Sequence, residues 1–586
     1  MKRIKQWILP YRQALPALLL YQLLTSVVTS LWMLGFSQLC GLLIRGTGRV
    51  ALSSGDFLFL FTTWQGYVII LLAILTLFFL VGMDINALVI LCGRILGGEK
   101  PNVLFCIKEG FLSLRRFLNP RGLVIVLYLS LLSPILGFGV SISLTQNLYI
   151  PKFITSVIYS KPLYLIGVGV VFAALIFLGV IFMFILHGTL LDQMSLKESG
   201  RNSVRLIRKN LKDFIKNIIL FFVLYFLVIV IVVALFFLIV FVKSFIPLSE
   251  SANLPVSMAI TLVAAFLILF ILAFFLPFYL LKLTMLYKRY QSAGGWEYQK
   301  KKNRKSPLVI AVAIGAVLAI VGITSFVTIF GETLFPNDNN TVYIAHRAGG
   351  SEAPENTAAG VDAAYRFGAS GSEIDIQRTS DGYYVVNHDA NFKRTAGVDK
   401  KPSEMTLAQV KELRVDGEPV PTLEEMLEAC RGRVTLYVEL KGETADEQMA
   451  EDAVRIIKEY QMEDEAVLIS LKYNLIDYIE TNYPEMETGY LAFASFGDTA
   501  SLNCDSLALE EETATDDMIL SIHEKGKKIF VWTVNDYDDL YTFLNSDADG
   551  IITDNIAGAK QVTAVLKSRA LLDRAFDGVL SFLFGR

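Results

Sequence analysis

The most constraining feature of this chain is an uninterrupted apolar run at residues 218–242, IILFFVLYFLVIVIVVALFFLIVFV, which contains no charged residue. A helix of about 20 apolar residues crosses the roughly 30 Å of hydrocarbon in a bilayer. The run therefore predicts a membrane-spanning helix. A mean hydropathy of +0.50 over 586 residues indicates that the membrane influences much more of the chain than this segment.

Seven apolar runs in the first part of the chain are long enough to cross a bilayer. The first is too long, and begins too far from the N-terminus, to be a cleaved signal peptide. We therefore predict an all-α membrane domain over residues 1–336 with about seven transmembrane helices. The runs cover residues 15–43, 66–92, 121–142, 162–190, 216–242, 257–286 and 308–331.

The charge balance of the chain changes at the end of this predicted domain. Residues 1–336 hold 30 Lys and Arg against 10 Asp and Glu, and residues 337–586 hold 23 against 46. The first part is therefore apolar and basic, whereas the second has the acidic composition of a soluble domain. We expect no nucleic-acid partner.

Basic residues gather in alternate loops of the membrane domain, which is the pattern of cytoplasmic loops. With seven spans, this pattern places the N-terminus inside and the residues after Phe330 outside. We therefore predict a multi-pass protein of the cell membrane with a cytoplasmic N-terminus and an extracytoplasmic second domain. The basic clusters lie at residues 2–12, 94–121, 197–216 and 288–305.

Strand and helix patterns alternate through the second half of the chain, which favours parallel strands joined by helices. The predicted strands are VYIAH, SEIDI, YYVVN, VTLYVEL, AVLIS, KIFVWTV and GIITD, and the predicted helices are TAAGVDAAYRFG, TLEEMLEAC, DEQMAEDAVRIIKEY and TDDMILSIHEKG. We predict an α/β (β/α)8 TIM barrel over residues 337–567, with a doubly wound sheet as the alternative. An amphipathic tail follows at residues 568–586.

Three carboxylates lie at the predicted ends of two strands. Glu373 and Asp375 are two residues apart, so both side chains point to the same face of one strand. Glu439 and Lys441 repeat this spacing at the end of a later strand. The carboxyl ends of barrel strands converge, so we expect these side chains to meet. Because carboxylate oxygens suit a hard cation, Glu373, Asp375 and Glu439 predict a site for one Ca²⁺ or Mg²⁺.

Two of the four histidines in the chain also lie at predicted strand ends. His346, followed by Arg347, ends the first strand, and His388 follows YYVVN. Cleavage of a phosphodiester requires the phosphate charge to be neutralised, a nucleophile to be deprotonated and an alkoxide to be protonated. A cation with Arg347 and Lys441 suits the first task. The two histidines suit the other two near neutral pH, and either of them could be the base.

The order of these motifs resembles the glycerophosphodiester phosphodiesterase family from about Val342 to Ala557. The matching segments are HRAGGSEAPENT, SEIDIQRTSDGYYVVNHD, FKRTAG, MTLAQVKEL, VPTLEEML, YVELK, VWTVN and DGIITD. The hydrophobic half resembles the membrane domain that some bacterial members carry. The family fold is a (β/α)8 barrel with a small insertion after the second strand, here at about residues 389–420.

The resemblance implies a role for each residue at the strand ends. His346 and His388 match the catalytic histidines, Glu373, Asp375 and Glu439 match the metal ligands, Arg347 and Lys441 match phosphate-binding positions, and Trp532 matches an aromatic residue of the substrate pocket. The implied reaction is metal-dependent hydrolysis of glycerophosphodiesters to an alcohol and glycerol 3-phosphate. In some members it passes through a cyclic phosphate.

Three features of the second half leave alternatives open. Ala348 stands where the family usually has glycine, although Gly349 and Gly350 follow it. The pair Asn356-Thr357 can be interpreted as a simple helix N-cap. The tail at residues 568–586 has apolar residues at helical spacing, so it lies either on the membrane surface or against the barrel.

We expect a membrane-anchored phosphodiesterase that acts on a glycerophosphodiester, a lysolipid or a glycerophosphate polymer of the cell envelope. A phosphatidylinositol-type or lysophospholipid phosphodiesterase is an alternative, although the ExD…ExK set and PENT argue against the phosphatidylinositol type. A membrane transporter or sensor with a degenerate barrel is an alternative of another class. The complete set of acid, base and metal residues argues against degeneracy.

Overall fold

The computed structural model describes residues 2–47, 51–53, 59–80, 85–126, 128, 161–292, 296, 298, 306–336, 340–493 and 495–584. The chain forms two compact units. The helical unit comprises Met1–Leu39 and Val68–Gly331, and the barrel unit comprises Cys40–Tyr67 and Glu332–Arg586. The boundary at Gly331 lies near the predicted end of the membrane domain. The sequence pattern does not predict that Cys40–Tyr67 belongs with the barrel.

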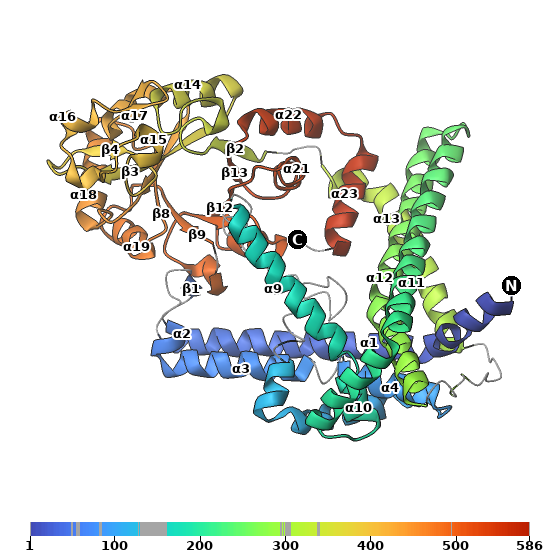
Figure 1. Cartoon of the computed structure of the whole chain (residues 1–586). Helices are drawn as coiled ribbons and strands as arrows, with labels where there is room; N and C mark the ends of the chain where they lie inside the picture. Colours follow the sequence, from blue (N-terminus) through green and yellow to red (C-terminus); the bar gives the residue numbers. More distant parts are fainter. Residues whose placement is uncertain are drawn as a thin grey trace. The chain divides into compact units, whose positions relative to one another are not determined.

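The described residues of the helical unit form helices and no strand (Figure 1). In hydrocarbon, every backbone N–H and C=O group must be paired within the protein, and a helix achieves this within one segment. The helices are α1 (Lys2–Arg45, which continues into the barrel unit), α3 (Trp64–Leu80, which begins there), α4 (Ala87–Leu96), α5 (Val103–Leu112), the 3-10 helix η3 (Ser113–Phe117), α9 (Pro162–Ile181), α10 (Ile185–Leu191), α11 (Leu196–Ser244), α12 (Glu250–Gln291) and α13 (Pro307–Leu334).

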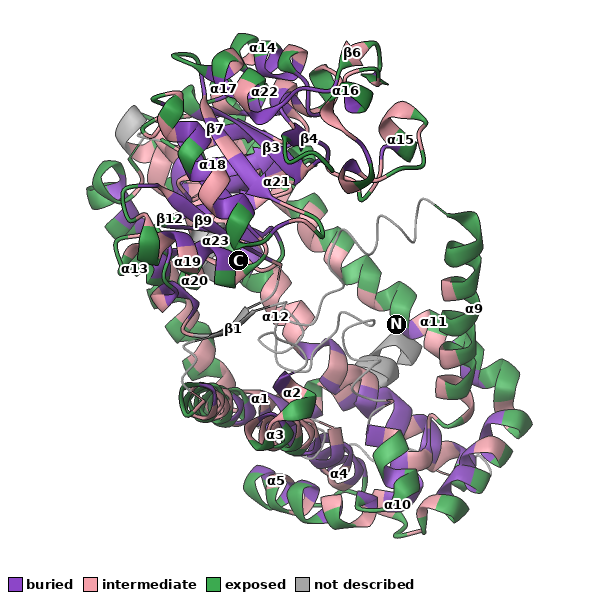
Figure 2. Cartoon of the chain, turned by 90° about the vertical axis from the view of Figure 1, so that its left-hand side faces the viewer, coloured by how far each residue is buried: buried purple, intermediate pink, exposed green. Residues whose placement is uncertain are grey.

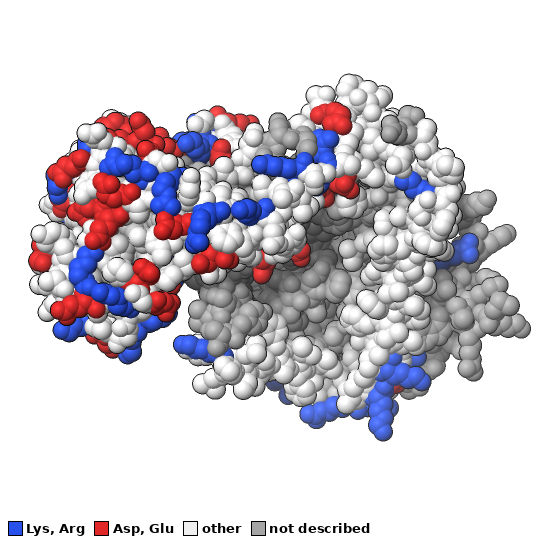
Figure 3. Space-filling model, turned by 90° about the horizontal axis from the view of Figure 1, so that it is seen from above, with Lys and Arg blue, Asp and Glu red and all other residues white. Residues whose placement is uncertain are grey.

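Five segments of the described chain are long and apolar enough to cross a membrane. They are Leu9–Arg45, Pro162–Leu191, Leu196–Ser244, Ala252–Gln291 and Pro307–Leu334, and each contains one of the predicted spans. Their outer surfaces are apolar: Phe226, Phe237 and Phe241 of α11 are each more than 60% exposed. Figure 3 shows few charged side chains on the visible face of the helical unit and many on the barrel. A bilayer accounts for this apolar surface.

The predicted spans at residues 66–92 and 121–142 are not found as single helices. The described residues of the first belong mainly to α3 and α4, with residues 81–84 outside the described part of the chain, and eight of the ten α4 residues are buried. Most of the second lies outside the described residues. The number of seven spans therefore stays a prediction.

Eight parallel strands form a closed barrel in the barrel unit. Neighbouring strands pair all the way round, and the pairing of β2 with both β3 and β13 closes the ring. This closure confirms the (β/α)8 barrel over the doubly wound sheet. The strands are β2 (Val342–Ala345), β3 (Gly371–Arg378), β7 (Thr435–Leu440), β8 (Ala466–Ser470), β9 (Thr488–Ala492), β11 (Ser506–Glu510), β12 (Lys528–Trp532) and β13 (Gly550–Thr553).

α-Helices follow every barrel strand except β9 and cover the outside of the barrel (Figures 1 and 2). Outward-facing residues such as Ile374 and Val438 pack under these helices, while Ile469, Ala508 and Phe530 fill the interior. The helices are α14 (Ala358–Phe367), α17 (Leu423–Cys430), α18 (Glu447–Glu459), α19 (Tyr473–Asn482), α20 (Asp516–His523), α21 (Tyr537–Leu544) and α22 (Ile556–Lys567). Two single-turn 3-10 helices, η4 (Gly350–Glu352) and η6 (Thr499–Ser501), lie in the loops.

The predicted strand YYVVN is not a strand of the barrel. It forms β4 (Tyr384–Val386), which pairs antiparallel with β3 because the short turn between them cannot make a parallel crossover. Short elements around a small apolar cluster follow it, at the position of the predicted insertion. They are α15 (Lys393–Ala396), η5 (Pro402–Glu404), α16 (Leu407–Val410), β5 (Arg414–Val415) and β6 (Glu418–Pro419).

Two segments extend the barrel unit beyond its ring. β1 (Ala51–Ser53), with α2 (Phe59–Thr62) after it, pairs antiparallel with β10 (Ser495–Gly497) in the loop after β9. The tail forms α23 (Leu571–Phe584), in which Arg574 is buried and donates hydrogen bonds to Glu332 and to the carbonyl of Phe335. The first half of the tail therefore packs on its own unit.

Candidate active site

All eight residues predicted for the site lie at the carboxyl ends of strands or in the loops that follow them. Parallel strands in a barrel bring these ends to one mouth. The residues are His346 and Arg347 after β2, Glu373 and Asp375 on β3, His388 after β4, Glu439 on β7, Lys441 after β7 and Trp532 at the end of β12. The indole N–H of Trp532 donates to the carbonyl of Ala508 at 2.8 Å. Trp532 is therefore grouped with the other seven residues by its position at the strand end, and not by a hydrogen bond to them.

The three predicted carboxylates meet inside the barrel. Glu373, Asp375 and Glu439 are all at least 95% buried, and each offers an oxygen within 4.8 Å of the other two. Glu373 and Asp375 both point inward because residues two apart on β3 share one face of the strand. The carboxylates thus occupy interior positions that apolar side chains fill on the other strands. The Lys441 ammonium bonds to Asp375 and Glu439, each at 2.8 Å. The group therefore carries a formal charge of minus two.

Electrostatics in this cluster reflect its excess of negative charge. Burial, reinforced by the Asp375 charge, raises the pKa of Glu373 to about 7 and that of Glu439 to about 8. Burial would also raise the pKa of Asp375, but the Lys441 charge and hydrogen bond outweigh it and hold this pKa below its ordinary value. A divalent cation among the three carboxylates would stabilise their ionised forms and so lower the raised pKa values of Glu373 and Glu439.

Asn356 belongs to this cluster, although the sequence pattern could be interpreted as a helix cap. Thr357 is the actual N-cap of α14, since its hydroxyl accepts from the N–H of Gly360. Asn356 instead adopts a left-handed conformation with φ of 56° and donates its side-chain N–H to Asp375 at 2.9 Å. It thereby holds the carboxylate that Lys441 also contacts.

His346 is oriented by a carboxylate that the sequence analysis did not single out. Its Nδ1 lies 2.7 Å from Asp554, which follows β13 and also accepts from the Asn535 side chain at 2.8 Å. Burial would lower the pKa of His346, but the Asp554 hydrogen bond and the charges of Glu373 and Asp554 outweigh burial and the Arg347 charge. The pKa of His346 is therefore raised, which favours its protonated form.

His388 has the opposite balance. Its Nδ1 lies 3.0 Å from Asp389, which is itself ion-paired with Arg394. Burial and the charges of Lys441 and Arg347 lower the pKa of His388, and the charge of Asp375 and the Asp389 hydrogen bond only partly offset them. The neutral form of His388 is favoured, with Nδ1 hydrogen-bonded to Asp389 and Nε2 available as an acceptor.

Arg347 is positioned to bind an anion at the mouth. Its backbone N–H donates to Glu373 at 2.9 Å, and its guanidinium contacts Glu355 at 3.3 Å. Arg394 holds the same Glu355 through a bidentate contact of 2.7 and 2.8 Å. The Nε of Arg347 is buried and has no hydrogen-bond partner among the described residues. A buried donor without a partner is costly, so this group favours an anionic acceptor.

The loop that carries His346 and Arg347 is tightly packed. Ala348, which stands at the family's glycine position, has a φ of 74°, a left-handed conformation that favours glycine. Its side chain lies against Gly360 of α14, where an added Cβ would come within 2.7 Å of the Ala348 Cβ. The methyl group of Ala348 therefore fits because the facing residue of α14, Gly360, has no side chain.

Comparison with known families identifies both halves of the chain. Residues 4–326, more than half of the chain, match the family described as "Membrane domain of glycerophosphoryl diester phosphodiesterase". Residues 346–557 match the "Glycerophosphoryl diester phosphodiesterase family". Barrel and mouth thus define a phosphodiester hydrolase. The chain belongs to the glycerophosphodiester phosphodiesterases that carry a membrane domain.

Individual relatives match the catalytic half. The glycerophosphodiester phosphodiesterase of Caldanaerobacter subterraneus is 29% identical over 229 residues, which are 37% of this chain and 94% of that protein. The glycerophosphodiester phosphodiesterase of Bacillus altitudinis is 26% identical over 233 residues, 36% of this chain and 94% of that protein. A solved phosphodiesterase of Oleispira antarctica, in complex with the product sn-glycerol-3-phosphate, has 25% identity and a TM-score of 0.36, covering 40% of this chain and 99% of that one.

We predict that Gly360→Ala destabilises the barrel by about 1–3 kcal/mol, because the new methyl group overpacks the loop that follows His346. Ala348→Gly in the same chain should recover part of this loss, since it removes the nearest atom and the strained φ. Thermal unfolding of the purified full chain, with a double-mutant cycle, measures both effects. Ala358→Ser, an exposed change on the same helix, is the control. Equal stability of Gly360→Ala and the parent would contradict the packing described.

Proposed function

We propose that the barrel hydrolyses glycerophosphodiesters to an alcohol and glycerol 3-phosphate, with His346 and His388 as acid and base and with a divalent cation at Glu373, Asp375 and Glu439. The observation that carries the proposal is the meeting of three buried carboxylates, an unsatisfied Arg347 Nε–H and two carboxylate-oriented histidines at one barrel mouth. These groups together supply every function that phosphodiester hydrolysis requires.

The carboxylate group fits a hard cation. Its formal charge of minus two, after Lys441 is included, equals the charge neutralised by one Ca²⁺ or Mg²⁺, and all three ligands are oxygens. When bound, the cation would neutralise negative charge on the phosphate and polarise its oxygens. Arg347 would bind a further phosphate oxygen through the free Nε–H. Trp532 would line the substrate pocket beside them.

The opposite pKa shifts of the two histidines support one assignment of base and acid. His388, whose pKa is lowered, would take the proton of the attacking hydroxyl, whether that of water or of the substrate glycerol. The new P–O bond forms as the bond to the leaving alcohol breaks. His346, whose pKa is raised, would give its proton to the departing alkoxide oxygen. Asp389 and Asp554 would hold each ring in the required orientation.

The chemistry of the site restricts substrates only to a glycerol phosphodiester. A soluble glycerophosphodiester, a lysolipid and a glycerophosphate polymer of the envelope all contain this unit. Residues 346–557 match the glycerophosphoryl diester phosphodiesterase family, and this match favours glycerophosphodiester substrates over the phosphatidylinositol-type or lysophospholipid alternative. The bilayer is the natural partner of the helical unit.

We propose domain boundaries at residues 1–336, 337–567 with the insertion at about 389–420, and 568–586. We also propose that the N-terminus is cytoplasmic and the barrel extracytoplasmic. The basic loops support this orientation. The pairing of β1 with β10 supports a barrel on the side opposite to the N-terminus, because the segment between the first two spans must then share one side of the membrane with the barrel.

The function predicts that His388→Ala and His346→Ala each lower kcat for glycerophosphodiesters by about 10²–10⁴-fold, the typical contribution of a general acid or base. Release of glycerol phosphate by the purified full chain measures the effect. His523→Ala is a matched control, because His523 also pairs with an aspartate, Asp549, but lies away from the mouth. Parental turnover by the His388→Ala variant would refute the proposed base.

The pH profile should be bell-shaped, with the acidic limb set by His388 below its ordinary pKa and the alkaline limb set by His346 above it. Asp554→Asn removes a negative charge that raises the pKa of His346, so the alkaline limb should move to lower pH. Asp389→Asn should move the acidic limb to lower pH. The kcat/KM profile measures both shifts, and Asp549→Asn should leave both limbs in place. Movement of the opposite limb by either variant would reverse the assignment of acid and base.

A chelator should abolish activity, and added Ca²⁺ or Mg²⁺ should restore it. The cation at about 100 times its Kd should also stabilise the folded barrel by about 2.7 kcal/mol. Asn356→Ala should weaken cation affinity by about 10–100-fold, because Asn356 orients Asp375. Activity titrated against each cation measures this shift, with the exposed Asn482→Ala as the control. Full activity in chelator would remove the cation from the proposal.

Orientation can be tested by labelling introduced cysteines in intact cells with a maleimide that does not cross the membrane. Glu524→Cys in the barrel unit should be labelled, and Arg208→Cys in the basic first part of α11 should be labelled only after the cells are opened. Both positions are exposed. The reverse pattern would place the barrel inside the cell.

A further inference from the structure

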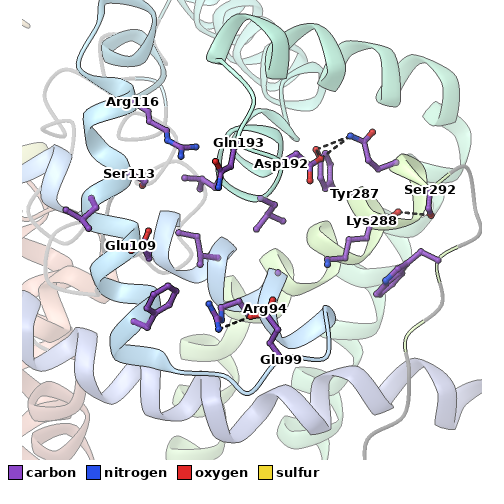
Figure 4. Close-up of a pocket in the computed structure, with 18 of the residues that line it drawn as sticks. Arg94, Glu99, Glu109, Ser113, Arg116, Asp192, Gln193, Tyr287, Lys288 and Ser292 are labelled. Carbon is purple, nitrogen blue, oxygen red and sulfur yellow. Dashed lines mark hydrogen bonds and ion pairs between the residues drawn. The ribbon is translucent and has the colours of Figure 1, made fainter.

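A polar cavity of about 750 Å³ lies within the helical unit, apart from the catalytic residues. It is bounded by α4, α5, η3, the loop after α10 and the end of α12 (Figure 4). This volume is within the usual range of small-molecule sites. The catalytic function of the barrel does not use this cavity.

Cationic side chains reach the cavity from three separate segments. Figure 4 shows Arg94, Arg116 and Lys288 approaching the same space from different elements. The charged residues that line it are the cations Arg94, Arg115, Arg116 and Lys288 and the carboxylates Glu99, Glu109 and Asp192. The formal balance is one positive charge, which equals in magnitude the charge of a single phosphodiester.

Two of the three carboxylates are engaged by neighbouring groups. Glu99 pairs with Arg94 at 2.7 Å. Asp192 accepts hydrogen bonds from the Tyr287 hydroxyl and from the Gln291 amide. These contacts occupy both carboxylates, although their negative charge still acts on the nearby Lys288 ammonium.

The cations retain unused hydrogen-bonding capacity. The Nε of Arg94 is buried without a hydrogen-bond partner among the described residues, although the guanidinium also lies 4.6 Å from the Phe105 ring centre. Within the part of the chain that the structure describes, the Arg116 guanidinium donates to the neutral carbonyl of Thr189, at 2.6 Å. A buried donor without a partner is costly, so these groups favour an anionic acceptor.

The position of the cavity restricts the source of that anion. Arg94 and Lys288 stand in the last turns of α4 and α12, where apolar helix gives way to basic loop. Basic pockets at this level of a membrane protein meet lipid headgroups. In the orientation proposed above, this end is cytoplasmic, on the side of the membrane opposite to the barrel.

We propose that this cavity binds the phosphodiester of a glycerophospholipid headgroup or of a water-soluble glycerophosphodiester. Arg94, Arg116 and Lys288 hold the phosphodiester oxygens. Glu109 and Ser113 line the same cavity and are available to hydroxyl groups of the ligand. The site is distinct from the catalytic mouth and recognises a related chemical group.

The test uses the full chain purified in a phosphate-free maltoside detergent. Phosphatidylglycerol, or a phosphate-free glucosyl diacylglycerol with the same acyl chains, is added, and retained lipid is counted by native mass spectrometry. The parent chain and the control Lys209→Gln, which changes an exposed lysine in the basic first part of α11, should retain phosphatidylglycerol preferentially. The double variant Arg116→Gln with Lys288→Gln should retain at least fivefold less.

Competition with soluble glycerophosphoglycerol separates the two sources. Displacement of the lipid would identify a site that also binds the free diester. No displacement would identify a site for the lipid alone. Either result supports the proposal if the double variant loses binding. Equal retention by the double variant and Lys209→Gln, or equal retention of the glucosyl lipid by the parent, would overturn it. If the double variant does not fold, Arg115→Gln, an exposed change, should lower retention at least twofold.

Discussion

Mutual repulsion among Glu373, Asp375 and Glu439 is the constraint on which the catalytic half depends. Three buried carboxylates within 4.8 Å of one another are unfavourable unless positive charge compensates them. Lys441 compensates one charge, Asn356 holds one oxygen, and a divalent cation would complete the balance. The barrel core gives up apolar packing on β3 and β7 so that this group can form, and the remaining strands supply the interior packing that supports it.

The features of the barrel that follow from local pattern were predicted from the sequence. The strand patterns that were recognised include β7, whose sequence TLYVEL is mostly apolar, and β3, where Ile374 and Ile376 alternate with Glu373 and Asp375. The i, i+2 spacing of Glu373 and Asp375 placed both carboxylates on one face. β9 and β11, and the helices α19 and α21, were not predicted. Their sequences, such as TGYLA and SLALE, are short and mix small or polar residues, so periodicity alone does not separate them from loops.

The same division applies to the site. His346, His388 and the three carboxylates were predicted because strand ends in a barrel converge. Asn356, Asp554 and the Glu355–Arg394 pair act through contacts that tertiary folding creates, and Asp554 lies 208 positions from the histidine that it orients. In the helical unit, apolar runs predicted the long helices, whereas the burial of α4 among its neighbours is created by tertiary packing, which the apolar pattern does not reveal.

The β1–β10 ladder joins residues 51–53 to residues 495–497 within the barrel unit. Because a ribosome makes the chain from its N-terminus, β1 is synthesised and its flanking helices can insert long before β10 exists. The ladder can form only after five of the eight barrel strands have been made, since β11, β12 and β13 follow β10. Its closure therefore comes well after synthesis of β1, and it connects the assembly of the catalytic unit to a segment that lies between the first two apolar stretches of the chain.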